Sequence, residues 1–175
     1  MSKFPQASAA TITALLSLGL LLLSAPVSAD LNQSLMDKFA IADVVAQYAY
    51  KWDTKDAEAY ANLFTEDGIS EVWLPGKSEP LARRETRQAI LAAAKKAHTT
   101  RLSGRQTRHH QSALIFHEIS ATSALTQNMV LITHQTTEDD APVPKYSGIY
   151  KDEWRKTQHG WLLSRRSLYL DPIIQ

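Results

Sequence analysis

The chain has 175 residues, of which 44% are hydrophobic, 21% charged and 8% aromatic, and these proportions exclude a disordered or fibrous protein. Its formal net charge of +1 provides no strong field for a nucleic acid or an anionic membrane surface, so neither is an expected partner. The sequence contains no cysteine, which excludes disulfides, thiolate nucleophiles, zinc–thiolate sites and iron–sulfur clusters.

The first 29 residues differ in composition from the rest of the chain. They contain one charged residue, Lys3, then an uncharged apolar run, and they end with the small residues Val27 and Ala29. This order is typical of a secretory signal peptide. We therefore predict that residues 1–29 are removed before Asp30, and that the mature chain is periplasmic or secreted, without membrane contact. An uncleaved anchor is the alternative, although the apolar run is shorter than the roughly 20 residues of a membrane span.

The mature part, residues 30–175, is predicted to be a single domain without linkers or repeats. Because Lys3 is the only charged residue before it, this part carries 18 basic and 18 acidic residues and no net charge. A domain of this length without disulfides is held together by its hydrophobic core.

The first half of the mature chain is predicted to be mainly helical. A first helix is expected from about Ser34 to Trp52, because its apolar residues recur with a period of 3.6. Thr54 is expected to cap a second, short helix, and a third helix is expected from Thr86 to Ala97.

A turn and a short strand are expected between the second and third helices. Asp67 and Gly68 indicate the turn, and residues 69–74 the strand.

The second half of the mature chain is predicted to be a four-stranded antiparallel meander. Its β-branched and aromatic runs, separated by turn-like pieces, cover residues 107–119, 123–137, 145–157 and 161–170. Helices followed by such a meander indicate an α+β fold in which about three N-terminal helices close one end of a curved sheet. A cone-like arrangement of this kind encloses an apolar pocket.

Tyr48 and Asp53 are the first candidates for chemistry. Tyr48 belongs to the apolar stripe of the first helix, and Asp53 follows that helix in a segment rich in aromatic residues. A carboxylate that points inward from such a segment is a plausible base or a partner for a histidine. The alternative is that Tyr48 is a core aromatic and Asp53 a capping residue.

Two adjacent histidines, His109 and His110, lie in a predicted strand, where successive side chains point to opposite faces. Only one of them can therefore face the concave side of the sheet. We predict that it is His109, because Ala113 and Ile115 on the same face are small or apolar and suit a cavity wall. Arg108 is then expected to point away from the cavity. Side chains at consecutive strand positions diverge, so no metal site is predicted.

His134 ends an apolar strand, a usual position for a polar residue at a cavity mouth, although an ordinary histidine near solvent is the alternative. The remaining histidines, His98, His117 and His159, are expected in surface or loop positions.

Four segments of the mature chain resemble the SnoaL-like family of the nuclear transport factor 2-like superfamily. They cover residues 41–53, 56–68, 107–110 and 147–161. The second is the most specific, because it ends in the pattern Tyr-Ala-x-Leu-Phe-Thr-x-Asp-Gly, which recurs throughout that family. The resemblance covers nearly all of the mature chain and implies the cone-like α+β fold with its pocket.

Members of the scytalone dehydratase and bile-acid dehydratase type are similar to this chain at the chemical positions. They carry an aspartate after the first helix and a histidine on the strand after the third helix, which match Asp53 and His109. The resemblance implies that His109 is the general base or acid and that Asp53 orients its ring. It also implies that Tyr48 polarises a substrate oxygen and that His134 assists the departure of water. Many relatives have asparagine where this chain has Ala113, so one polar substrate contact is expected to be missing.

The resemblance thus implies a lyase or isomerase that transfers a proton on a small, largely apolar hydroxylated or carbonyl substrate. No metal or organic cofactor is expected. Four further residues are expected to contact the small-molecule substrate: Trp52, Trp73, Ile132 and Tyr150. A non-catalytic ligand-binding or association module of the same fold is the alternative, and an interaction role for the sheet face is a third. A homodimer or homotrimer is expected, and light scattering would measure it.

Overall fold

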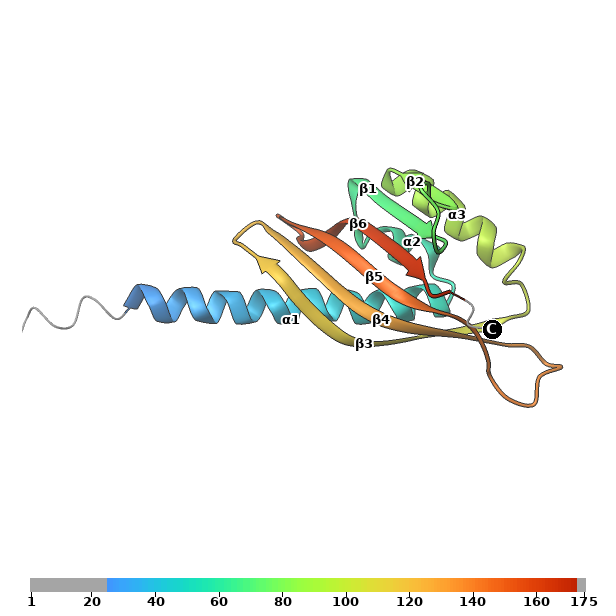
Figure 1. Cartoon of the computed structure of the whole chain (residues 1–175). Coiled ribbons are helices and arrows are strands. Elements are labelled where there is room, and N and C mark those ends of the chain that lie inside the picture. Colours follow the sequence, from blue (N-terminus) through green and yellow to red (C-terminus); the bar gives the residue numbers. More distant parts are fainter. Residues whose placement is uncertain (1–24, 173–175) are drawn as a thin grey trace, which may run out of the picture. The chain divides into compact units, whose positions relative to one another are not determined.

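The computed structural model describes residues 25–172 (Figure 1). The predicted signal peptide lies largely outside these residues. The described residues from Ser34 onwards belong to one compact unit. Among the described residues, no helix combines the length and the hydropathy that a membrane span requires.

Three helices precede or interrupt the sheet, as the sequence predicts. Helix α1 covers Ala25–Asp53, so it begins before the predicted start at Ser34. Helix α2 covers Ala57–Ala61, and its cap is Asp56, whose carboxylate accepts a hydrogen bond from the amide of Ala59. The prediction that Thr54 caps this helix is wrong, because its hydroxyl donates to the carbonyl of Tyr50 in the last turn of α1.

Helix α3 covers Arg87–Thr99, and the hydroxyl of its cap, Thr86, accepts a hydrogen bond from the amide of Ala89. It packs against α2 and against the first two strands. Its buried side includes Ile90 and Ala94.

The sheet has six strands in the order β2-β1-β6-β5-β4-β3 (Figure 1). The predicted meander is confirmed in its four antiparallel strands, which are β3 Gln106–Ile119, β4 Ser123–Gln135, β5 Val143–Thr157 and β6 Gly160–Leu170. Strand β1, Phe64–Trp73, runs parallel to β6, and the short strand β2, Ala82–Glu85, pairs with its outer edge. The α+β class with N-terminal helices on a curved sheet is therefore confirmed.

Asp67 and Gly68 lie inside β1 rather than in a turn before it. The register between β1 and β6 shifts between Phe64 and Ile69, which marks a bulge around these two residues. A β-carbon on Gly68 would lie 2.8 Å from the carbonyl oxygen of Thr65, so the bulge needs glycine here.

Gly148 allows β5 to approach β6 closely. A β-carbon at this position would lie 2.3 Å from the carbonyl oxygen of Tyr169, which is backbone and cannot turn aside. We expect Gly148→Ala to lower the free energy of unfolding by about 1–3 kcal/mol, the usual cost of overpacking. Urea denaturation would measure this, with exposed Ser147→Ala as the control. Equal stability of the two variants would contradict the packing argument.

Candidate active site

A cavity of about 600 Å³ lies between the inner face of the sheet and the helices that cover it. Each predicted catalytic residue except Asp53 contributes to its wall, namely Tyr48, His109 and His134. Asp53 lies behind His109, with 7% of its surface exposed. The fold therefore brings residues from α1, β3 and β4 to one cavity.

Asp53 and His109 are in direct contact. The Oδ1 atom of Asp53 lies 2.8 Å from Nδ1 of His109, and its Oδ2 accepts a hydrogen bond of 2.8 Å from the His109 amide. The hydroxyl of Thr107 donates to Oδ1 at 2.6 Å. Both side chains of the pair are 7% exposed. Asp53 thus joins the end of α1 to the start of β3 and fixes the imidazole at the same time.

The ionisation of Asp53 fixes the tautomer of this histidine. Burial raises the pKa of Asp53, but the hydrogen bonds from His109 and Thr107 and the charge of His109 outweigh burial and lower the pKa below its ordinary value. The carboxylate is therefore ionised at neutral pH and accepts hydrogen bonds only. Nδ1 of His109 must carry the proton, which leaves the lone pair of a neutral ring on Nε2.

Tyr48 lies in a cluster of aromatic rings beside His109. Its ring centroid is 6.4 Å from that of His109 and 5.6 Å from that of Tyr150. The hydroxyl of Tyr60 donates to the Tyr48 oxygen at 3.0 Å. Because this bond occupies a lone pair of Tyr48 and not its proton, the Tyr48 hydroxyl can still donate to a bound oxygen.

His134 lies on β4 opposite Thr107 in the register of the sheet, and Ile132 lies opposite His109. His134 and Ile132 both line the cavity. Burial lowers the pKa of His134, and the positive charges of Arg105, Arg101 and Lys145 lower it further. His134 is therefore a neutral imidazole at pH 7.

The residues predicted to contact a substrate divide into two groups. Trp52, Ile132 and Tyr150 line the cavity. Trp73 does not belong to the lining, so its prediction as a substrate contact is not supported. It pairs with Tyr169 across β1 and β6, and the two rings stack with centroids 5.7 Å apart. Tyr169 is 38% exposed, which places the stacked pair on the outer side of the sheet.

His109 lines the cavity, whereas His110 is exposed and lies 3.4 Å from the hydroxyl of Thr133. The prediction that Ala113 and Ile115 continue the face of His109 is wrong. Ala113 has a φ of 54°, and the register of β3 shifts between Ser112 and Ile115. This bulge reverses the alternation, so that Ile115 is 46% exposed and Leu114 and Phe116 pack against the core instead.

Arg166, which was not among the residues predicted from the sequence, is a fully buried arginine in the cavity wall. Its guanidinium lies between two tyrosine rings, with Cζ 4.0 Å from the centroid of Tyr48 and 3.7 Å from that of Tyr150. It donates to the side-chain oxygens of Gln111 at 2.5 Å and Asn128 at 3.4 Å. Strand alternation could have indicated this residue, because Arg166 shares a face of β6 with Leu168 and Leu170.

Asp152 lies opposite Arg166 in the register of β5 and β6. Its Oδ2 is 3.4 Å from a terminal guanidinium nitrogen, close enough for an ion pair, but neither carboxylate oxygen accepts a hydrogen bond. Burial raises the pKa of Asp152 to about 6, and the charge of Arg166 opposes this rise. The pair is therefore incompletely satisfied.

His98 is a buried residue of α3 and not the surface residue that the sequence suggested. It is 7% exposed and packs against Trp52, with the ring centroids 4.8 Å apart. Burial and the charges of Lys55 and Arg101 lower its pKa.

Residues 25–172 contain no group of three or more histidine, aspartate or glutamate side chains that could hold a metal ion.

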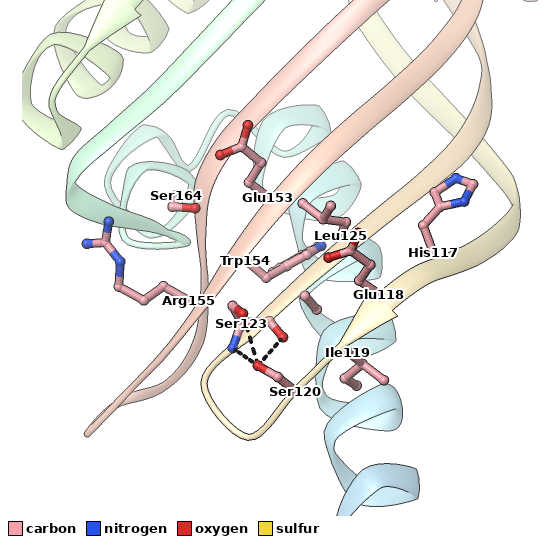
Figure 2. A pocket seen from close by; sticks show the side chains of 11 residues that line it. His117, Glu118, Ile119, Ser120, Ser123, Leu125, Glu153, Trp154, Arg155 and Ser164 are labelled. Atoms are coloured by element: carbon pink, nitrogen blue, oxygen red, sulfur yellow. Dashed lines mark hydrogen bonds between the residues drawn. The ribbon is translucent and has the colours of Figure 1, made fainter.

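A second hollow lies beside the turn between β3 and β4 (Figure 2). Its wall includes His117, Glu118, Glu153 and Arg155, all of which are exposed. Glu153 pairs with Arg165 at 3.2 Å, and Arg155 pairs with Asp67 at 2.9 Å. This hollow is a weaker candidate than the first cavity, because Glu153 and Arg155 are exposed and already occupied by ion pairs.

Comparisons with known proteins agree with the fold. The model of the SnoaL-like domain matches residues 33–167. A solved structure from Novosphingobium aromaticivorans, named as a candidate scytalone dehydratase, is 26% identical, with a TM-score of 0.67 over 82% of this chain and 89% of that one. A nuclear transport factor 2-like protein with a cystatin-like fold from the same organism is 22% identical, with a TM-score of 0.70 over 85% of this chain and 90% of that one.

A protein of unknown function from Mycobacterium tuberculosis is 25% identical, with a TM-score of 0.68 over 85% of this chain and 78% of that one. No protein with a curated description matches. Because the family model spans most of the chain, the protein belongs to the SnoaL-like domain family, which has the nuclear transport factor 2-like fold.

Proposed function

We propose that the protein is a lyase or isomerase of the dehydratase kind, in which His109 moves a proton of a small hydroxylated or carbonyl substrate. The observation that carries this proposal is the contact of 2.8 Å between His109 and Asp53 at the wall of the cavity. Among the described residues, Nε2 of His109 has no hydrogen-bond partner, so it is available to a bound molecule.

The first step is removal of a proton from a carbon next to a carbonyl or a hydroxyl-bearing carbon. Nε2 of His109 takes this proton, and the ionised Asp53 stabilises the imidazolium that forms. The electron pair of the broken C–H bond forms a double bond. In an isomerase, the proton returns to another carbon.

In a dehydratase, the same electron pair expels the hydroxyl, which leaves as water after it receives the proton from His109. The Tyr48 hydroxyl donates to the substrate carbonyl, where negative charge develops. His134, which is neutral, donates an N–H to the departing hydroxyl. No group outside the chain is needed to balance these steps.

The comparisons support the reaction class at a coarse level. A structural relative at 26% identity carries a dehydratase name, but that activity belongs to the relative. Because this fold hosts many unrelated functions, the proposed reaction rests on the arrangement of this chain's own residues.

A binding module is the second candidate, and one observation favours it. Asp53 accepts hydrogen bonds from the His109 amide and from the Thr107 hydroxyl as well as from the imidazole. These bonds connect α1 to β3, which is a structural role. In that case the polar residues satisfy one another and the cavity only holds a ligand.

One experiment separates the two candidates. Native mass spectrometry of the purified protein identifies any co-purified ligand. This ligand, and its hydroxylated and carbonyl analogues, are then each incubated with the protein in D2O. If the protein is the proposed lyase or isomerase, the recovered compound carries deuterium at the carbon next to the carbonyl, or it has lost water. A ligand that binds tightly and is recovered unchanged and unlabelled contradicts the lyase or isomerase.

A further inference from the structure

The mouth of the cavity carries unbalanced positive charge. Three cationic side chains belong to the lining, Arg84 from β2, Lys96 from α3 and Arg101 from the segment after α3. Lys96 and Arg101 are exposed and Arg84 is half-buried, so these charges lie where the cavity meets solvent. They come from three separate elements and converge on one opening.

No acidic residue within residues 25–172 forms an ion pair with any of these three cations. Arg83, Arg87 and Arg165, by contrast, are each paired with a glutamate. Glu71 is the only acidic residue of the described lining, and it is occupied by Arg83 at 2.8 Å and Arg165 at 3.1 Å.

One histidine of the lining, His134, responds to part of the same charge. Arg105, Arg101 and Lys145 add to burial in lowering the pKa of His134. Asp139 lies within reach of Arg105 and Lys145, but its carboxylate is held by two hydrogen bonds from Thr136. The charge of Arg101 therefore acts on His134, one of the predicted catalytic residues.

The interior of the cavity has the opposite character. Deeper in the wall, apolar and aromatic side chains dominate, including Trp52, Ile90, Ala94, Leu168 and Leu170. Arg166 is also part of this wall, but Asp152 balances its charge and two tyrosine rings enclose it. A ligand that suits both regions has an apolar body and an anionic end.

We propose that the cavity binds an amphipathic organic anion, whose apolar, ring-sized body lies beside His109 and whose carboxylate, sulfonate or phosphate stays at the mouth with Arg84, Lys96 and Arg101. This inference rests on the proposed function in that the anion is the substrate class of that reaction. A mouth of this charge also draws anions from solution, an effect that salt screens over about 10 Å at 0.1 M.

A matched pair of fluorescent probes tests the charge requirement. 1-Anilinonaphthalene-8-sulfonate carries a sulfonate, and N-phenyl-1-naphthylamine has the same ring framework without it. We expect the unmodified protein to bind the sulfonate more tightly, with an affinity that falls between 0.05 and 0.5 M NaCl, roughly the range in which surface charges become screened. Equal affinities, or a salt-independent sulfonate affinity, would overturn the proposal.

Substitution locates the effect. The triple variant Arg84→Gln, Lys96→Gln, Arg101→Gln is expected to weaken sulfonate binding by about tenfold, given the usual strength of exposed ion pairs, and to change naphthylamine binding by less than about twofold. The control variant Arg108→Gln, Lys77→Gln, Lys151→Gln removes the same charge from exposed residues outside the lining. An equal loss in both triple variants would show that net charge, and not the mouth, binds the anion.

The same probes separate this inference from the proposed reaction. His109→Ala removes the predicted base but none of the mouth cations, so it is expected to keep the preference for the sulfonate. If the mouth variant alone loses that preference while no compound is turned over, the anion site stands and the lyase or isomerase fails. If the protein turns over a substrate, and the mouth variant changes the turnover of neutral and anionic substrates equally, the anion site is wrong while the proposed reaction stands.

Discussion

Replacement of His109 by alanine is expected to lower the rate of the proposed reaction by a factor of about 10²–10⁴, the usual contribution of a general acid or base. The variant removes the imidazole that Asp53 orients at the cavity wall. The loss is expected in kcat, because the proton moves during the chemical step and not during binding. Steady-state kinetics on the substrate identified by labelling would measure it.

His110→Ala is the matched control, since it removes the same side chain from the adjacent residue on the outer face. It is expected to keep nearly full activity. His109→Gln adds a second control for folding, because an amide can still donate to Asp53 while it cannot act as a base. If His110→Ala loses activity and His109→Ala retains it, the site assignment is wrong even though the fold stands.

The order and type of the elements could be predicted because local signals determine them. The turn-like pieces around Ser120, Asp139 and Gly160 separate the runs that became β3 to β6. Strand β2 was missed because its Ala-Arg-Arg-Glu sequence has no apolar alternation and depends on pairing with β1. Asp56 replaced Thr54 as the cap because α1 extends through Asp53 and engages the Thr54 hydroxyl.

The candidate site could be predicted only where a single helix or an unbroken stretch of strand determines its geometry. The placement of Tyr48 follows from one helix stripe. Strand alternation requires that only one of His109 and His110 faces the cavity, and the family resemblance, not the face shared with Ala113 and Ile115, selects His109 correctly. The bulge at Ala113 breaks that alternation through a positive φ that alanine seldom adopts, so no sequence signal marks it. The contact between Arg166 and Asp152 depends on the register between β5 and β6, which strand boundaries alone do not give.

Arg166→Leu is expected to lower the free energy of unfolding at pH 7 by about 3–5 kcal/mol, the usual cost of removing one partner of a buried ion pair. The variant leaves Asp152 with no countercharge at full burial, and it removes the donor that Gln111 and Asn128 share. It also removes the cation between the rings of Tyr48 and Tyr150. Arg166→Lys keeps the charge but not the planar stacking, so an intermediate loss is expected. Urea denaturation would measure each variant.

The cost of Arg166→Leu is expected to shrink as the pH falls from 7 to 5. In the folded protein, burial raises the pKa of Asp152 from 3.8 to about 6, so this group contributes stability that is fully present below pH 3.8 and is lost as the pH rises through 6. Without Arg166 the folded-state pKa rises further, and the variant loses additional stability only above pH 6. At pH 5 Asp152 is protonated in both folded proteins, so its part of the difference disappears. In the Asp152→Asn background neither protein has this carboxyl, so the cost of Arg166→Leu measured against Asp152→Asn alone should not change between pH 5 and 7 through this group. A cost of Arg166→Leu that stays constant between pH 5 and 7 would show that the charge of Asp152 is not what the arginine balances.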